Sequence, residues 1–194
     1  ADWLKPFLRP IAVINSASSS GPFLRALSGP NRVIVTSTRS GFEQNYARFG
    51  GYLAAAVGNL ASDLDKDGQV SLLEAFLFAS RETAEFYKVE GRLATEHALL
   101  DDNGDGLGTP ADWFRGVRAV KKPVEKANLD GLRANQFHLI RSEQDRNLTP
   151  EQRQRRDELE VAVEALRERK AQMPEDDYYA ELEKLMVRLS EFYR

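Results

Sequence analysis

One acidic segment of twelve residues, 63–74, constrains this chain more than any other feature. It reads Asp-Leu-Asp-Lys-Asp-Gly-Gln-Val-Ser-Leu-Leu-Glu, with oxygen-bearing side chains at positions 1, 3, 5, 9 and 12 and glycine at position 6. Carboxylates this dense repel one another unless a cation neutralises them, and the glycine permits the sharp turn that brings them together. The oxygen ligands offered to a hard divalent cation are Asp63, Asp65, Asp67, the Gln69 carbonyl, Ser71 and Glu74.

The spacing is that of an EF-hand calcium loop, so Ca²⁺ is the cofactor that we expect. A simpler interpretation uses the same residues. Ser71 and Glu74 form a Ser-x-x-Glu capping box ahead of an apolar run, and that alone would start a helix. Thr149-Pro150-Glu151-Gln152 carries the same cap with no acidic loop before it, so a helix start does not require the aspartates.

A second loop, 101–112, repeats the pattern as Asp-Asp-Asn-Gly-Asp-Gly-Leu-Gly-Thr-Pro-Ala-Asp. Its predicted ligands are Asp101, Asn103, Asp105, the Leu107 carbonyl, Thr109 and Asp112. This copy is the weaker one, because Gly108 replaces the branched apolar residue expected at position 8 and Asp112 is shorter than glutamate. Thr109-Pro110 also reads as an N-cap followed by proline at N1. With starts 38 residues apart, the two loops resemble a paired EF-hand.

Composition excludes several classes of protein. A formal net charge of −3 argues against a nucleic-acid binder, and 42% hydrophobic residues suffice for a globular core. The absence of cysteine excludes disulfide scaffolds, thiolate zinc sites and a cysteine nucleophile. We expect no membrane span and find no signal-peptide pattern. Because calcium at about millimolar levels outside the cytosol would fill even a weak loop, an envelope or extracellular setting is favoured.

Two β-branched runs, 11–15 and 32–36, predict buried parallel strands joined through a short helix over 23–27, which makes one βαβ unit. Next, Ser40-Gly-Phe-Glu43 reads as a capping box. It is followed by an apolar stripe at helical spacing, which predicts a helix with a buried aromatic face: Phe42, Tyr46, Phe49 and Leu53.

Helices are also expected over 72–88, ending near Gly91, and more briefly after the second loop through Trp113 and Val117. Residues 121–148 read as a linker with one extended candidate, 136–140. Two amphipathic helices, 150–172 and 174–193, then predict an antiparallel helical hairpin.

Two parallel strands make a sheet too small to stand alone. We therefore infer that residues 1–120 are the later half of an α/β domain whose earlier strands lie upstream or on another chain. In this division 121–148 is the linker and 149–194 the hairpin.

The polar turns after the two strands carry a family resemblance. Ser18-Ser19-Ser20-Gly21 follows the first strand. The second continues as Val33-Ile-Val-Thr-Ser-Thr-Arg-Ser-Gly41, with Glu43 and Tyr46 beyond it. These turns resemble the caspase-like peptidase fold, and within it the legumain-like branch, whose first turn reads Cys-x-Ser-Gly. The resemblance is carried by residues 11 to about 50, and it implies a partial caspase-like parallel sheet within a caspase-like portion over residues 1–120.

This chain departs from that family at the catalytic positions. Ser18 stands where the resemblance implies the nucleophilic cysteine, and serine is a poor nucleophile without an adjacent base. The family's histidine precedes the nucleophile, whereas His97 and His138 both follow Ser18. The family's dyad cannot be assembled from these residues, and the chain is more consistent with a binding protein than with an enzyme.

Three functions fit these patterns. The one we favour is a non-catalytic, calcium-binding, caspase-like domain that serves in protein binding or assembly, with a protein partner or the upstream half of a longer chain. The alternative is a hydrolase in which Ser18 acts with a histidine from a missing segment or a companion chain. The third is a calcium sensor, but Met173 and Met186 both lie outside the loops, so static binding is the better interpretation.

Overall fold

The computed structural model describes residues 2–7, 9–125 and 127–193, which form a mixed α/β chain. Two compact units are present, the first ending at Ile140 and the second beginning at Arg141. Residues 121–140, which we expected to be part of a linker, thus belong to the first unit.

The helices of the first unit are α1 (Gly21–Leu27), α2 (Phe49–Val57), α3 (Leu72–Val89) and α4 (Leu132–Gln136). Its strands are β1 (Ile11–Asn15), β2 (Arg32–Thr36), β3 (Val70–Ser71), β4 (Leu99–Asp101), β5 (Phe114–Arg115), β6 (Arg118–Ala119) and β7 (His138–Ile140). The second unit contains α5 (Glu143–Asn147), α6 (Pro150–Glu168) and α7 (Glu175–Ser190).

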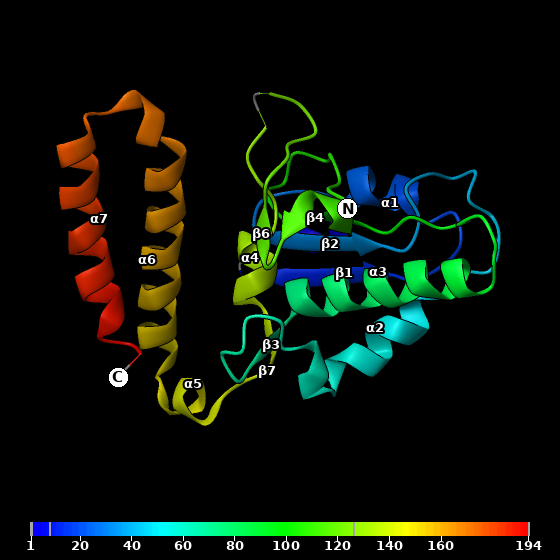
Figure 1. Cartoon of the computed structure of the whole chain (residues 1–194), viewed down its shortest axis with the longest axis horizontal. Coiled ribbons are helices and arrows are strands. Elements are labelled where there is room, and N and C mark those ends of the chain that lie inside the picture. Colours follow the sequence, from blue (N-terminus) through cyan, green and yellow to red (C-terminus); the bar gives the residue numbers. More distant parts are fainter. Residues whose placement is uncertain (1, 8, 126, 194) are drawn as a thin grey trace. The chain divides into compact units, whose positions relative to one another are not determined.

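The main sheet has the strand order β1-β2-β4 (Figure 1). Strands β1 and β2 are parallel, in register from Ile11 opposite Arg32 to Asn15 opposite Thr36. Because α1 connects them, the predicted βαβ unit is confirmed, with the predicted strand bounds. The third strand was not predicted. The short run β4 pairs antiparallel with β2, with Leu100 opposite Val35, and so supplies one additional strand from within the chain.

The core of the first unit lies between the sheet and two helices that pack on each other, α2 and α3. Val33 and Val35 of β2 contribute to it, together with Phe49 of α2 and Phe76 of α3. Successive strand residues face opposite sides, so the buried Ile34 points to the other face, where α1 contacts β2 and β4. Each such side chain, when fully buried, contributes about 1.5–3 kcal/mol through the hydrophobic effect.

The helix predicted from Ser40 begins later than expected. Residues 41–48 are irregular, with a turn at 41–42, and α2 starts at Phe49, because the buried Glu96 carboxylate accepts hydrogen bonds from the N–H groups of Arg48 and Phe49. A residue distant in sequence thus caps this helix. The predicted buried stripe is consequently wrong in its first half, since Phe42 and Tyr46 are 93% and 78% exposed.

Helix α3 agrees with its prediction over almost its whole length. Ser71 and Glu74 form both hydrogen bonds of a capping box at its start. Just beyond its end, Gly91 adopts a φ of +62°, and the Gly91 N–H donates to the Lys88 carbonyl. A glycine in the left-handed region is a common helix terminator because it carries no Cβ.

The helix predicted after the second loop is absent from this described stretch. A single 3-10 turn, Ala111–Trp113, leads into the β5-β6 hairpin, in which Gly116 has a φ of +57°. The segment is extended rather than helical because of how Phe114 packs. The Phe114 ring lies edge-on against the Phe76 ring at a centroid distance of 6.5 Å, and an extended segment delivers it there.

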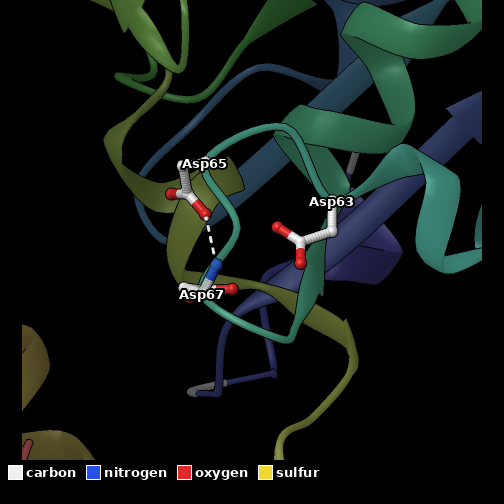
Figure 2. Close-up of side chains that lie close together, drawn as sticks. All are labelled: Asp63, Asp65 and Asp67. Atoms are coloured by element: carbon white, nitrogen blue, oxygen red, sulfur yellow. Dashed lines mark hydrogen bonds between the residues drawn. The ribbon is translucent and has the colours of Figure 1, made fainter.

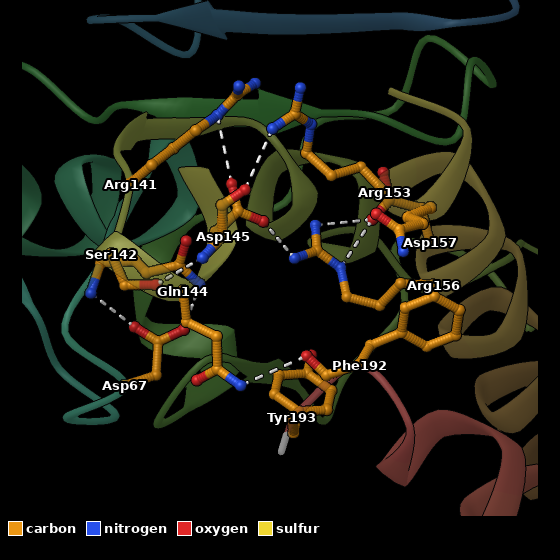
Figure 3. Close-up of polar contacts among 12 residues, drawn as sticks. Asp67, Arg141, Ser142, Gln144, Asp145, Arg153, Arg156, Asp157, Phe192 and Tyr193 are labelled. Atoms are coloured by element: carbon orange, nitrogen blue, oxygen red, sulfur yellow. Dashed lines mark hydrogen bonds and ion pairs between the residues drawn. The ribbon is translucent and has the colours of Figure 1, made fainter. Parts of the chain in front are cut away.

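In the second unit, α6 and α7 contact each other, and the predicted capping box at Thr149 and Gln152 is formed. The buried residues on α6 are Arg156, Leu159, Val163 and Leu166. Figure 3 shows the polar network at the start of this unit, where Arg156 binds Asp145 and also lies 2.8 Å from Asp157. Removing one partner of such a buried pair typically costs about 3–5 kcal/mol.

Among the described helices, none combines the length and the apolar character that crossing a bilayer requires.

Candidate metal centre

The first acidic loop holds its aspartates in place with its own backbone. The two Asp63 oxygens accept from the N–H groups of Lys66 (2.7 Å) and Gly68 (3.1 Å). Asp65 accepts from the Asp67 N–H at 3.3 Å, and Asp67 accepts from the Gln69 N–H at 2.8 Å. Each carboxylate therefore accepts at least one hydrogen bond from a backbone N–H of its own loop, in a local turn.

These three carboxylates converge, as Figure 2 shows. One oxygen from each of Asp63, Asp65 and Asp67 lies within 4.8 Å of the others, and among the described residues this is the one such group of three acidic, histidine or cysteine side chains. Asp63 is buried, whereas Asp65 and Asp67 are exposed. Although Asp65 is exposed as a residue, partial desolvation of its carboxyl, together with the charges of Asp67 and Glu74, raises the pKa of Asp65 to about 6. The cluster is thus short of positive charge, which a divalent cation could supply.

Glu74 links this loop to helix α3. One carboxylate oxygen accepts from the N–H groups of Leu64 (2.7 Å) and Asp65 (3.4 Å). The other accepts from the Ser71 N–H at 2.8 Å and the Ser71 hydroxyl at 2.9 Å. Glu74 consequently caps the helix and closes the loop at once, while it is not one of the three carboxylates that converge.

Gln69 and Ser71 lie beside these carboxylates. The buried Gln69 donates from its side-chain amide to Asp67 at 3.0 Å. Ser71 is also buried, and its hydroxyl lies 3.2 Å from the Asn135 side-chain oxygen as well as bonding Glu74. The structure therefore brings all six predicted residues of the first loop into one local network.

The second loop reproduces the backbone of the first. Asp101 accepts from the N–H groups of Gly104 (3.0 Å) and Gly106 (3.1 Å), Asn103 from that of Asp105 (2.8 Å), and Asp105 from that of Leu107 (2.7 Å). These are the same position pairs as in the first loop.

Positions 4 and 6 also have a positive φ in both loops. The four values are +63° at Lys66, +80° at Gly68, +84° at Gly104 and +74° at Gly106. The repeat seen in the sequence is therefore a repeat of local structure.

Asp130, a residue outside the predicted loop, closes the second loop. One Asp130 oxygen accepts from the N–H groups of Asp102 (3.0 Å) and Asn103 (3.3 Å), and the other from the Thr109 hydroxyl (2.6 Å). These are loop positions 2, 3 and 9, the same positions that Glu74 contacts in the first loop. Asp112, the predicted residue at position 12, lies exposed in the following 3-10 turn.

The second loop is also more buried than the first. Asp101, Asp102 and Asp130 are each at most 4% exposed. Burial, and then the nearby Asp102 carboxylate, raise the pKa of Asp130 to about 8. Asp102 itself accepts from the N–H groups of Gly131 and Ala134, which holds helix α4 against the loop. Because its described carboxylates do not converge as those of the first loop do, the second loop is the weaker candidate.

The two loops do not pair with each other, contrary to the paired arrangement that we expected. Val70, at position 8 of the first loop, pairs with Ile140 of β7. In the second loop Thr109 pairs with Leu100. Gly108 occupies position 8 there because an added Cβ would lie 2.8 Å from side-chain atoms of Leu24 and Leu99.

The strand-end turns, which carried the family resemblance, are joined by hydroxyl groups. The buried Ser20 hydroxyl accepts from the N–H groups of Ser37 and Thr38 and so ties the two turns together. The Ser18 hydroxyl donates to the Asn45 carbonyl at 2.6 Å. A carbonyl is not a general base, so this contact does not activate the serine.

Both histidines lie in contacts that join segments of the fold: His97 contacts Glu43, and His138 lies in a strand pair. The His97 ring Nδ1 lies 2.5 Å from a Glu43 carboxylate oxygen, and the same carboxylate accepts from the Arg39 N–H. His138 lies in β7, opposite Ser71 of β3. Glu43, predicted to cap a helix, serves instead to hold the second strand-end turn to the segment before β4.

Sequence reasoning missed Asp130 and Asp102. One local signal was present, since Asp130-Gly131 is a turn dipeptide and Gly131 has a φ of +114°. That signal predicts a turn, but nothing in the spacing associates residue 130 with a loop that begins at residue 101.

Comparison of the chain with known protein families, with curated proteins and with solved structures finds no match.

Proposed function

We propose that this chain is a non-catalytic, calcium-binding α/β domain that serves in protein binding or assembly. The observation that carries the proposal is the convergence of Asp63, Asp65 and Asp67, whose oxygens lie within 4.8 Å of one another on a loop of calcium-binding spacing. Glu74 is not part of that group of three, but its carboxylate adds to the negative charge around Asp65.

The chemistry of the donors favours a hard cation. All the side chains offered are carboxylates, hydroxyls or amides, and Ca²⁺ prefers oxygen ligands in flexible arrangements. A bound ion would offset the mutual repulsion of the aspartates and fix the loop between α2 and α3. Since the loop geometry is already formed by local hydrogen bonds, the proposed role is static stabilisation of the fold rather than sensing.

The second loop is proposed as a weaker site for the same ion. Its donors would be Asp101, Asn103, Asp105 and Thr109, with Asp130 in place of Asp112. The raised pKa of Asp130 means that a proton and a cation compete for this site, which lowers its apparent affinity near neutral pH.

Calorimetric titration of the whole chain with calcium chloride tests both sites. We expect two binding events, of which the tighter is lost in Asp63→Ala and the weaker in Asp101→Ala and Asp130→Ala. Asp112→Ala is the matched control and should leave both events unchanged. Magnesium chloride should bind at least about tenfold more weakly, because this ion demands a stricter octahedral geometry. Absence of calcium-dependent heat from the wild type would overturn the proposal.

The non-catalytic part of the proposal is supported by the surroundings of Ser18, whose hydroxyl donates to a carbonyl. The partial resemblance of the chain to the caspase-like fold then implies a binding role. The proposed partner is a protein or the upstream half of a longer chain, and the proposed setting is the cell envelope or the extracellular space. Hydrolysis of a peptide substrate by the purified chain, lost in Ser18→Ala, would instead favour a hydrolase.

A further inference from the structure

One segment, residues 131–140, connects the two acidic loops. At its start, the Asp102 carboxylate of the second loop accepts from the Gly131 N–H at 2.9 Å and from the Ala134 N–H at 2.8 Å. At its end, strand β7 pairs antiparallel with β3, which forms positions 8 and 9 of the first loop (Figure 1). Although the loops do not pair with each other, this segment therefore joins them.

Strand β7 is held by a residue that is also a predicted cation ligand. Val70 lies opposite Ile140 in the strand pair, and Ser71, the predicted ligand at position 9, lies opposite His138. The Ser71 hydroxyl also lies 3.2 Å from the side-chain oxygen of Asn135, which precedes β7. A change in the position of Ser71 therefore affects both the loop and the segment.

The start of helix α3 supplies a further contact. Leu72 is the first residue of α3, so its N–H has no acceptor within the helix, and it donates to the Phe137 carbonyl at 2.9 Å. The strand pair itself is short, because β3 has two residues and the register shifts between Val70 and Ser71. A pair of this length is marginal by itself, so its stability depends on what fixes β3.

We propose that calcium in the first loop fastens β7 to the first unit, and that docking of β7 in turn strengthens calcium binding. The Gln69 carbonyl and the Glu74 carboxylate are offered on either side of β3, so an ion that fixes them fixes β3 as well. Because Ser71 contacts the segment and is offered to the ion, the two equilibria are coupled, and such coupling is reciprocal. The inference rests on the proposed calcium binding and names the segment that the ion stabilises.

Removal of the ion should loosen this end of the segment first. The like charges of Asp67 and Glu74 act on Asp65, and their repulsion opposes the closed loop when no cation offsets it. Strand β7 should then separate from β3 more often, in a local opening that does not require global unfolding. Because Arg141 directly follows β7 and begins the second unit, each opening lengthens the segment that connects the two units.

Amide hydrogen exchange of the whole chain, followed by NMR with saturating calcium chloride or with a chelator, measures the fastening. In chelator the Leu72 amide should exchange faster than the amide of Ala79, which is buried within α3, because opening at β7 is local. Calcium should slow exchange of the Leu72 amide at least about tenfold, because the ion binds the docked state more tightly. Asp63→Ala should abolish this effect of calcium.

Calorimetric titration with calcium chloride tests the reciprocal effect. Asn135→Ala removes the contact with Ser71 but changes no residue of the loop, and it should weaken calcium binding at the tighter site at least about fivefold. Asn147→Ala makes the same change at an exposed residue of the second unit and should bind calcium as the wild type does. Far-ultraviolet circular dichroism checks that both variants are folded.

The outcomes separate this inference from the calcium proposal on which it rests. If calcium binds but exchange of the Leu72 amide does not change, or if Asn135→Ala binds calcium as the wild type does, the coupling is wrong and the calcium site stands. Equal exchange of the Leu72 and Ala79 amides in chelator would also overturn the coupling, because β7 would then separate only on global unfolding. Absence of calcium-dependent heat from the wild type would overturn both proposals.

Discussion

The two acidic loops share one backbone and differ in the residue that closes them. The first is closed by Glu74, its own position 12, which also caps the helix that follows. The second is closed by Asp130, 29 residues after Asp101, while Asp112 is exposed. A loop of this kind thus requires an acceptor for the N–H groups at positions 2 and 3, and the chain can supply it either locally or from a distant segment.

The two loops also differ in how their carboxylates are arranged: those of the first converge, whereas Asp101, Asp102 and Asp130 around the second are buried. Both loops hold their side chains with the same backbone amides, but the first brings three carboxylates together near the surface, whereas the second adds the buried Asp102 and Asp130, which bond further amides. Backbone amides replace much of what a cation would otherwise provide. The second loop is therefore built more to join segments of the first unit, and the first is better suited to an ion.

Removing the distant closing residue should give the largest effect. Asp130→Ala leaves two backbone amides and the Thr109 hydroxyl without their acceptor, which should lower the free energy of unfolding by about 3 kcal/mol. Asp112→Ala should change it by less than about 0.5 kcal/mol. Urea titration followed by tryptophan fluorescence reports on this unit, because both tryptophans, Trp3 and Trp113, lie in it. Equal losses in the two variants would contradict the assignment of Asp130.

The second prediction concerns pH. Asp65 and Asp130 have raised pKa values, about 6 and about 8, through partial desolvation of the Asp65 carboxyl and burial of Asp130. Between the ordinary aspartate pKa and these values the native chain binds more protons than the unfolded chain, so stability without calcium should fall as pH rises from about 4 to about 8. Saturating calcium should flatten this dependence. Asp130→Asn should remove its upper part, between about pH 6 and pH 8; stability that increases with pH there would contradict the assignment.

Glu74→Gln tests the local closing residue and separates its two roles. Glutamine serves in capping boxes, so stability in chelator should change by only about 1 kcal/mol. Calcium affinity of the tighter site should fall at least about tenfold, a loss of about 1.4 kcal/mol, because a carboxylate ligand is removed. Asp130→Asn is the counterpart in the second loop and should leave the tighter event intact. If Glu74→Gln binds calcium as the wild type does, Glu74 is a helix cap alone.

Position 4 should have unequal effects in the two loops, and substitution in the first loop should give the smallest change of all. Gly104 has a φ of +84°, and an added Cβ would lie 3.0 Å from the Gly29 carbonyl carbon, so Gly104→Ala should cost about 1–2 kcal/mol. Lys66 already adopts +63°, and its ammonium donates to the Asp63 carbonyl at 2.6 Å.

Lys66→Gly therefore loses one contact while relieving backbone strain, and its net effect should stay within about 0.5 kcal/mol. Thermal unfolding of both variants, monitored by tryptophan fluorescence, measures the difference. A larger loss in Lys66→Gly than in Gly104→Ala would show that the Lys66 ammonium contact, rather than backbone conformation, dominates the energetics of position 4.

Sequence alone determined the parts of this protein that depend on neighbours along the chain. The extents of strands β1 and β2, helix α3 with its Ser71–Glu74 cap, and the turns of both acidic loops all follow from residues a few positions apart. Local backbone conformation and hydrophobic periodicity act over these distances, so the pattern of residues is sufficient to specify them.

Only the tertiary structure decided the contacts between distant segments. Glu96 sets the start of α2, Asp130 closes the second loop, and β4 completes the sheet beside β2. Each of these joins residues at least 21 positions apart, and no local spacing indicates which residues will meet. The physical reason is that a buried amide requires an acceptor but does not specify where in the chain that acceptor originates; folding brings it there.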